Sequence, residues 1–471
     1  MVNKLKLKLY TISHHMKYNF FKNYRVAIKK IKFCTYKNGE NDKSTKFNNL
    51  MRKTEQTIPH IFLETEIYFE FKDIFYRGLN LHSLCSYSTF DDIIYLLLYK
   101  RLPTRKEISD KNCYIENKFK NADLTKLIKI IKILEEDNFL ELIRISILQL
   151  SLKQQMYTRD NNLNYYDVMA YSLKLLMFFY YKKINYSYDM KHIKYDNLCS
   201  HIITYYGNKK FYKCNENNEK KSDENNEKQS DENNDKQCDE KKKLLNALFI
   251  LLCENDINEN TFLIRMISNA NSNNYFNICL SAISFFIDTL KKIDFYLALT
   301  SFLNFYTLLK KREAQNNKKK IGKNAKTINE NTNENTNENT NETPIDIMNI
   351  YNIELFFYNN NSYVKKNKIL KKYLTTFCNG TSQYNINLIN AFIQIEETIL
   401  KHKNKYPSCY FYALLIFHVL DIPLELLSSF YFLTRLASFT AHINEQNQNR
   451  KIVKFSSVYI GNTTMRQPDE V

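Results

Sequence analysis

The sequence predicts an all-α protein, and three observations support this prediction. Only 6 of the 471 residues are Gly and 6 are Pro, which is too few for a turn-dense β-sandwich or β-barrel. Hydrophobic residues make up 44% of the chain, enough to bury one large domain or two moderate ones. Apolar residues recur mostly at spacings of three and four, the periodicity of a helix face. Strand-like alternation is rare outside residues 61–77, where a short hairpin is expected.

Local signals mark where the first helices begin. Residues 89–100 follow Ser88 or Thr89 as N-cap and carry two acidic residues in their first turn, which predicts a helix. Thr104 and Glu107 have capping-box spacing and predict the start of the next one. The same periodicity predicts further helices at 124–154, 164–182, 242–254, 260–269, 274–291, 296–311, 384–402, 407–419 and 423–445.

Two low-complexity inserts interrupt the helical pattern. Residues 214–243 repeat an eight-residue unit, SDENNEKQ followed by SDENNDKQ, and residues 314–343 end in NTNENTNENTNE. Both are nearly free of apolar side chains, so burial cannot offset the entropy lost on ordering them. We therefore expect disordered surface insertions.

The positive charge is concentrated at the N-terminus. Residues 1–39 contain ten basic residues and no acidic one, which leaves +8 of the net charge of +18 for the rest of the chain. A basic, acid-free leader is typical of a transit peptide and predicts import into the mitochondrial matrix. The alternative is a cytoplasmic protein with a basic arm that binds RNA or anionic lipid.

Several classes of protein are excluded or disfavoured. No apolar run approaches about 18 residues, so no transmembrane segment is expected. The ten Cys include no CxxC pair, so neither a zinc module nor a disulfide framework is predicted, and a reducing compartment is expected. P-loop, GxGxxG and metal-ligand patterns are absent from the sequence, and no nucleic-acid partner is expected for the helical body.

Four blocks of sequence, in order, resemble the citrate synthase family. The first is YRGLNLHSLCSYSTFDDIIYLLLYKRLPTRKEI at 76–108, and the last is YPSCYFYALLIFHVLDIPLELLSSFYFLTRLASFTAHINEQ at 406–446. Between them, LLCENDINENTFLIRMIS at 251–268 is similar to the family's LHADHELNASTF segment, and NKILKKY at 367–373 is similar to AKILKEY. IVKFSSVYIG at 452–461 resembles the family's I-RPR-EYVG ending.

The resemblance implies a citrate synthase-like fold of two helical domains that works as a homodimer. The large domain would comprise 60–292 plus 420–471, and the small domain 293–419. It also implies a reaction, the condensation of acetyl-CoA with oxaloacetate to give citrate and CoA. A CoA thioester or a dicarboxylate is then the expected ligand, without a further cofactor. The family uses one Asp as base and two His as hydrogen-bond donors for this chemistry.

The acid–base residues that the resemblance implies are missing here. The position of the first catalytic His falls near Lys291, that of the second near Phe357, and that of the Asp at Tyr410. The family's oxaloacetate-contacting His falls at Asn255. No His lies between residues 201 and 402, so a shift of the alignment cannot supply either catalytic His.

Positive charge persists at the three positions where the family holds its dicarboxylate. Arg435 in TRLAS matches the family arginine in SRVAG, Lys366 replaces the DPR arginine, and Lys454 replaces the first arginine of the RPR ending. These three are the candidate substrate-binding residues, although Lys cannot supply the bidentate fork of Arg. His418 and His442 are expected to be core histidines, and Cys253 and Cys409 buried structural thiols.

The sequence therefore favours a citrate synthase-like protein with absent or severely impaired condensation activity, a pseudoenzyme. It would act as a homodimer, as a heterodimer with an active paralogue, or by binding a ligand. One alternative is an active citrate or 2-methylcitrate synthase-type acyltransferase with a rebuilt acid–base set. The other is a basic helical scaffold that binds RNA or anionic membrane.

Overall fold

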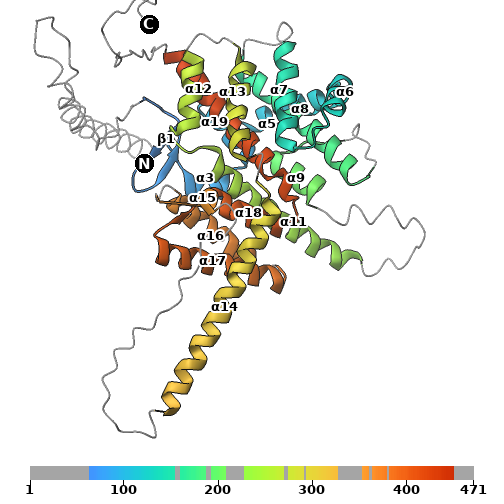
Figure 1. The fold of residues 1–471 in the computed structure, drawn as a ribbon. Helices are drawn as coiled ribbons and strands as arrows, with labels where there is room; N and C mark the ends of the chain where they lie inside the picture. The colour runs from blue at the N-terminus through green and yellow to red at the C-terminus, as the bar shows by residue number, and fades with distance from the viewer. Residues whose placement is uncertain are drawn as a thin grey trace, which may run out of the picture. The chain divides into compact units, whose positions relative to one another are not determined.

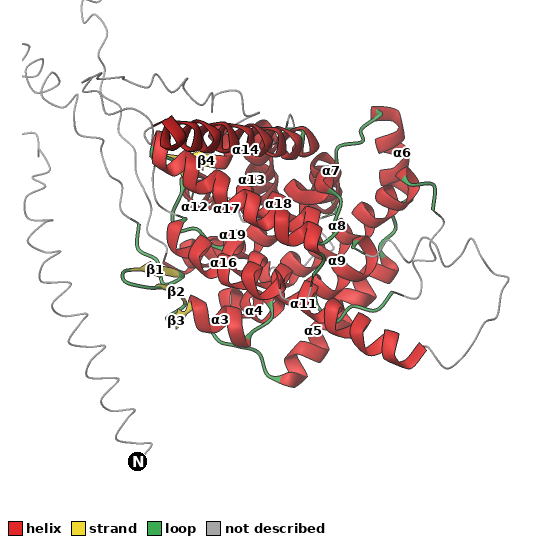
Figure 2. Cartoon of the chain, turned by 90° about the horizontal axis from the view of Figure 1, so that it is seen from below, coloured by secondary structure: helices red, strands yellow, loops and turns green. Residues whose placement is uncertain are grey.

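Helix α19 (Leu427–Asn449) and the C-terminal part of α11 (Glu227–Cys253), from residue 244 on, lie in the core of the fold, as Figures 1 and 2 show for α19. The computed structural model describes residues 63–153, 160–186, 193–207, 227–269, 274–290, 293–326, 353–359, 363–378 and 381–449. The other helices are α3 (Leu81–Tyr87), α4 (Phe90–Tyr99), α5 (Arg105–Asn121), α6 (Thr125–Leu134), α7 (Phe139–Leu152), α8 (Asn161–Lys183), α9 (Leu198–Tyr206), α12 (Glu259–Asn269), α13 (Tyr275–Leu290), α14 (Phe295–Lys326), α15 (Ile353–Phe356), α16 (Val364–Cys378), α17 (Gln383–Lys403), α18 (Cys409–Val419) and the 3₁₀ helix η4 (Leu424–Leu426). The predicted all-α class is confirmed.

The few strands are short and antiparallel. β1 (Tyr68–Glu70) pairs with β2 (Ile74–Tyr76) in the register Phe69 opposite Phe75, and β2 pairs with β3 (Leu79–Asn80). The hairpin expected near residues 61–77 is therefore present. A second pair, β4 (Phe357–Tyr358) with β5 (Tyr406–Pro407), joins two segments distant in sequence and fixes the chain just before α18.

The predicted helix starts at α4 and α5 are confirmed in atomic detail. Thr89 caps α4 through a capping box with Asp92, and Thr104 caps α5 through a capping box with Glu107. In each box a Thr hydroxyl accepts from a backbone N–H while the acidic side chain accepts from the Thr backbone N–H.

The single helix predicted over 124–154 is two helices, so that prediction is wrong. α6 ends at Leu134, because Glu135 adopts a left-handed conformation with φ of 52°. Asn138 then caps α7 by accepting from the backbone N–H groups of Leu140 and Glu141. Apolar residues keep the helical spacing of three and four across both helices. The polar turn between them interrupts the helical backbone but not this spacing, so the sequence pattern does not show the break.

Helix α11 extends into the segment expected to be a disordered insert. It begins at Glu227, well before the predicted start at 242, and ion pairs three residues apart join Lys242 to Asp239 and Lys243 to Glu240. Glu, Lys and Gln favour helical backbone, so the helix that begins in the polar repeat continues without interruption into the apolar half of α11. α14 likewise continues to Lys326, and the remaining insert residues lie outside the described ranges.

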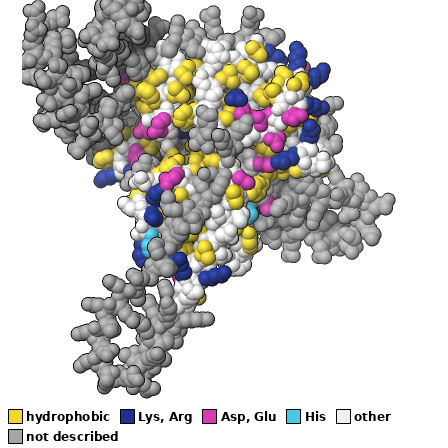
Figure 3. Space-filling model, in the orientation of Figure 1, with side chains coloured by type: hydrophobic (Ala, Val, Ile, Leu, Met, Phe, Trp, Pro, Cys, Tyr) yellow, Lys and Arg dark blue, Asp and Glu magenta, His cyan; other side chains and the backbone are white. Residues whose placement is uncertain are grey.

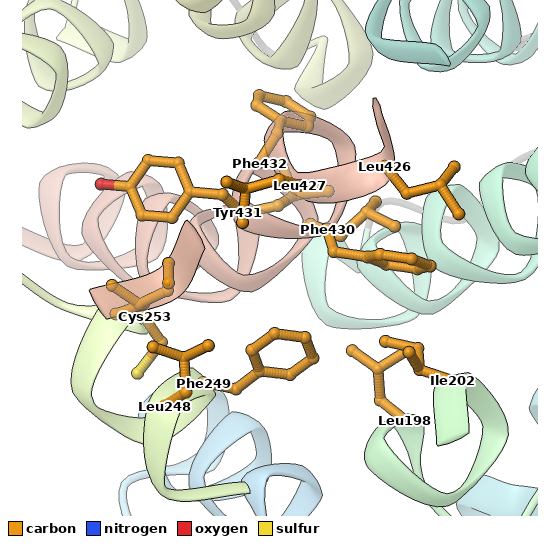
Figure 4. Close-up of a cluster of buried hydrophobic side chains, with 14 of the residues drawn as sticks. Leu198, Ile202, Leu248, Phe249, Cys253, Leu426, Leu427, Phe430, Tyr431 and Phe432 are labelled. Atoms are coloured by element: carbon orange, nitrogen blue, oxygen red, sulfur yellow. The ribbon is translucent and has the colours of Figure 1, made fainter. Parts of the chain in front are cut away.

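Helix α19 is buried on nearly all sides, and it packs against α4, α7, α8, α11, α12, α13 and α18. Figure 4 shows part of this core, where Phe430 and Leu427 face Phe249 of α11 while Tyr431 points away from them. The ring of Phe430 lies 5.4 Å from that of Tyr206, in an edge-to-face arrangement. A helix buried on all sides is typical of the centre of a large helical protein, and this one also buries polar residues such as Arg435, Ser438 and His442.

The surface is charged and mixed. On the face drawn in Figure 3, acidic and basic side chains lie among apolar ones. Within the described ranges no helix combines the length and the apolar character needed to cross a membrane. All described residues from Glu64 onward belong to one compact unit, and the division of that unit into the two expected domains stays a prediction.

Candidate functional site

A cavity of about 600 Å³ opens between the start of α12, the end of α13, and helices α18 and α19. The loop 255–258, which joins α11 to α12, forms one wall. The strand residues Tyr68, Glu70 and Tyr358 also line it. The full lining, among described residues, is Tyr68, Glu70, Asn255, Asp256, Ile257, Asn258, Glu259, Asn260, Phe285, Phe286, Leu290, Leu355, Tyr358, Tyr363, Tyr410 and Tyr431.

Tyr410, at the position of the family's catalytic Asp, lines this cavity. Ser408 caps α18 and its hydroxyl accepts from the Tyr410 backbone N–H at 3.2 Å, which fixes where the side chain leaves the helix. The ring lies 4.8 Å from that of Tyr431, and only 8% of the residue is exposed. Burial raises the pKa of Tyr410 well above its ordinary value near 10. Its hydroxyl makes no hydrogen bond with any described residue.

Phe357, near the position of the second catalytic His, does not reach the cavity. It is fully buried on β4, with its ring 4.8 Å from that of Phe411 and 6.3 Å from that of Phe302. Strand alternation instead turns the next residue, Tyr358, toward the cavity. The position is therefore occupied by part of an aromatic core.

Arg435 is 1% exposed and does not line the cavity. Its guanidinium donates to the backbone oxygen of Cys253 at 3.0 Å and to the hydroxyl of Thr261 at 3.3 Å, and it lies over the ring of Phe439. Arg435 is the candidate anion-binding residue with the strongest sequence match, and in this structure its guanidinium donates to protein oxygens. Cys253, which the sequence analysis expected to be a buried thiol, is fully buried.

Lys366 is likewise turned inward. It is 3% exposed, and its ammonium group donates to the backbone oxygen of Glu254 and to the side-chain oxygen of Asn255 at 3.2 Å. Asn255 in turn donates to the hydroxyl of Tyr363 at 2.7 Å. Burial lowers the pKa of Lys366 to about 8, against a smaller opposing effect of the Glu254 charge.

The buried carboxylate of Glu254 interacts electrostatically with both Arg435 and Lys366. One of its oxygens accepts from the hydroxyl of Ser438 and lies 3.2 Å from Nε2 of His442, and the other accepts from the backbone N–H of Asn255 at 2.8 Å. Burial alone would raise the pKa of Glu254, but His442, Arg435 and these hydrogen bonds outweigh it and hold the pKa at about 2. The side chain is therefore an internal counterion.

Sequence reasoning missed the role of Glu254, although a signal was present. Glu254 directly precedes Asn255 in one of the matched blocks, and Arg435, Ser438 and His442 are spaced three and four apart along one face of α19. His442 is fully buried, as expected for a core histidine, yet it also contacts a charged group. The sequence could not reveal that this face of α19 packs against Glu254 at the end of α11.

Two candidate positions lie outside the described residues. Lys291 and Lys454 both fall there, so their predicted roles stay predictions. Among the residues that are described, no group of three or more His, Cys, Asp or Glu is arranged to hold a metal ion. A second cavity of about 550 Å³ lies beside α16 and the β1–β2 turn and is lined by four lysines, Lys72, Lys365, Lys368 and Lys372.

Comparison with known proteins gives one consistent result. The family model for the citrate synthase C-terminal domain matches residues 59–286 and 360–456, well over half of the chain. A citrate synthase from Saccharolobus solfataricus is 39% identical over 44 residues, a match that spans only 9% of this chain and 12% of that protein.

Three solved citrate synthases share the fold at low sequence identity. The enzyme from Thermotoga maritima is 18% identical with a TM-score of 0.56, over 88% of this chain and 98% of its own. That from Thermoplasma acidophilum, solved as a ternary complex with carboxymethyl coenzyme A and oxaloacetate, is 12% identical with a TM-score of 0.58, over 86% and 96%. That from Pyrobaculum aerophilum is 15% identical with a TM-score of 0.53, over 86% and 92%.

Proposed function

Because the chain belongs to the citrate synthase family, we propose that it is a member that has lost the condensation of acetyl-CoA with oxaloacetate and acts by binding a small molecule in the cavity. The observation that supports this most directly is Tyr410. A carboxylate is needed to remove a methyl proton from the thioester, and the residue at that position is a buried phenol. With its pKa raised further by burial, its hydroxyl keeps its proton at neutral pH.

One of the two hydrogen-bond donor positions of the reaction is apolar as well. Phe357 presents no polar atom and lies in an aromatic cluster away from the cavity. Loss of a general base costs about 10²–10⁴ in rate, and loss of one oxyanion donor about 10²–10³. Since such groups act as a unit, their losses do not simply multiply. Little beyond binding would remain.

The acceptor site is also altered. Arg435 and Lys366 each donate two hydrogen bonds to protein oxygens, and the charge of Glu254 lies beside them. A dicarboxylate would have to displace these contacts and approach a fully buried anion. This argues against oxaloacetate as the ligand.

Release of CoA thiol tests the proposal directly. The full chain, acetyl-CoA and oxaloacetate should give no thiol above the protein-free rate. Tyr410→Phe is the informative variant, and Tyr384→Phe, an exposed tyrosine on α17, is its matched control. Thiol release that Tyr410→Phe abolishes and Tyr384→Phe leaves unchanged would refute the proposal.

One observation favours a second candidate, an active enzyme with a rebuilt acid–base set. Asp256 supplies a carboxylate to the same cavity that Tyr410 lines. Desolvation, supported by the charges of Glu254 and Glu70, raises the pKa of Asp256, which is the direction that suits a general base. Under this candidate Asp256→Asn would abolish a CoA release that the wild-type chain shows.

The proposal extends to assembly and location. We propose a dimer, either of two copies or with an active paralogue, and removal of a leader near residue 40 on entry into the mitochondrial matrix. Light scattering of the purified protein checks the first. N-terminal sequencing of the protein isolated from cells checks the second, since an intact N-terminus would favour the alternative of a basic arm in the cytoplasm.

A further inference from the structure

The cavity is lined by tyrosines and carboxylates. Five tyrosines (Tyr68, Tyr358, Tyr363, Tyr410, Tyr431) and three acids (Glu70, Asp256, Glu259) contribute to its wall, whereas none of its described lining residues is Lys, Arg or His. Aromatic faces carry partial negative charge, so both kinds of group favour a cation.

The three carboxylates are not equivalent. Glu70 is neutralised, because its oxygens contact the ammonium of Lys365 at 2.8 Å and accept from the hydroxyl of Tyr68 at 2.6 Å. Asp256 and Glu259 form no ion pair with any described residue, and both line the cavity. The described wall therefore carries two uncompensated negative charges.

The cations nearest to this wall do not offset those charges. Lys366 donates to the backbone oxygen of Glu254 and to Asn255, and its ammonium lies 5.5 Å from the centre of the Tyr68 ring. Arg435 donates to Cys253 and Thr261. Glu254 supplies a further negative charge beside these two cations. Among described residues, the balance around the cavity is thus opposite to what a dicarboxylate needs.

Tyr410 is a second, independent feature of this wall. The residue is only 8% exposed and lines the cavity, and its hydroxyl makes no hydrogen bond with a described residue. The oxygen is not one of the fully buried unpaired polar atoms, so it is accessible to a ligand. Its oxygen is free to accept a hydrogen bond from an N–H group, and the rings of Tyr410 and Tyr431, 4.8 Å apart, form an aromatic corner beside it.

We propose that this cavity binds a small organic cation, an ammonium or guanidinium group joined to an apolar or aromatic body. This inference rests on the proposed function, since it names the ligand that replaces the family's dicarboxylate. Asp256 and Glu259 attract the charge, Tyr410 accepts a hydrogen bond from it, and the body packs on Phe285, Phe286 and Leu290. About 600 Å³ is within the usual range for a drug-sized ligand.

Two probes of nearly equal size and opposite charge test the proposal. Calorimetric titration of the full chain at low salt compares 2-phenylethylammonium with 3-phenylpropionate, and oxaloacetate serves as a third probe. The amine should bind at least about tenfold more tightly than either acid. Added salt should weaken the binding of the amine, because salt screens the attraction between the amine and exposed carboxylates.

Variants assign the binding to this cavity. Asp256→Asn and Glu259→Gln should each raise the dissociation constant of the amine about three- to tenfold. Asn suits the left-handed backbone at 256, where φ is 56°, so this change should not disturb the loop. Asp110→Asn is the matched control, because Asp110 is exposed on α5, which does not line the cavity.

The outcomes separate this inference from the proposed function. Equal or tighter binding of the acids, absence of amine binding, or amine binding that neither cavity variant changes would overturn it. CoA release from acetyl-CoA and oxaloacetate would instead overturn the proposed function. A protein that releases no CoA and binds no amine would therefore refute the ligand class alone.

Discussion

Nε2 of His442 lies 3.2 Å from a carboxylate oxygen of Glu254, and both side chains are completely sealed from solvent. The two residues are 188 positions apart in sequence, one at the end of α11 and its loop, the other on α19. Arg435, on the same helix as His442, contributes a further positive charge that lowers the pKa of Glu254. The contact therefore joins α19 to the end of α11 through a buried charge.

Removing the buried carboxylate should destabilise the fold strongly. Glu254→Gln leaves His442, Arg435 and Lys366 without their counterion, and we expect the free energy of unfolding in urea to fall by about 3–5 kcal/mol. Glu425→Gln is the matched control, because its ion pair with Lys183 is partly exposed and should contribute less than about 1 kcal/mol. Equal losses in the two variants would contradict the interpretation.

Acid should unfold the protein partly through His201. This side chain is buried without a hydrogen-bond partner among described residues, and burial lowers its pKa to about 3. Below pH 6.5 the unfolded chain binds a proton that the folded chain does not, so stability should fall from pH 6.5 toward pH 3 at up to about 1.4 kcal/mol per pH unit.

His201→Leu should remove that contribution, and His82→Leu, at an exposed position, should not. Urea unfolding at pH 7, 6 and 5 measures the difference. If the gap between wild type and His201→Leu is the same at pH 7 and pH 5, the histidine does not titrate as expected.

Raising the pH above 8 should increase the stability of the protein through Lys366. Burial lowers the pKa of this ammonium group to about 8, so between pH 8 and about 10.5 the unfolded chain holds the proton longer than the folded chain. Stability relative to Lys366→Met should therefore rise with pH in this window, by about 1.4 kcal/mol per pH unit. Lys365→Met, at a side chain that is 40% exposed, is the matched control for this substitution.

Restoring a histidine at the second catalytic position should harm the fold without restoring chemistry. Phe357→His places a polar ring in the aromatic cluster around Phe411, and we expect a loss of about 2–4 kcal/mol on unfolding and no release of CoA thiol. Tyr358→His, at the neighbouring position that lines the cavity, should cost less. A catalytically competent Phe357→His protein would show that the position faces the substrate.

Much of the fold could be predicted because its determinants are local. The capping boxes of Thr89 and Thr104, the hairpin, and most helices follow from spacings within a few residues. The break at Glu135 could not, since apolar spacing continues across it and only the left-handed backbone ends α6. α16 was missed as a helix, although Leu370, Leu374 and Phe377 have helical spacing, because lysines occupy many of the positions between them.

The sequence singled out residues that the structure brings together, but not their contacts. Tyr410 and Asn255, both named from the matched blocks, line one cavity, whereas Arg435 and Lys366 donate to protein oxygens. Which partner a buried cation meets depends on tertiary packing, here of α11 and its loop against α19 and α16. No spacing within any one segment contains that information.

The position of α19 at the centre of the fold has a consequence for biosynthesis. It is the last helix described in the chain, yet helices from α4 onward pack around it. During translation, about 5–20 residues emerge per second, so the helices before α19 spend many seconds with their shared apolar faces uncovered. The nascent chain should therefore depend on chaperones until residue 449 has left the ribosome.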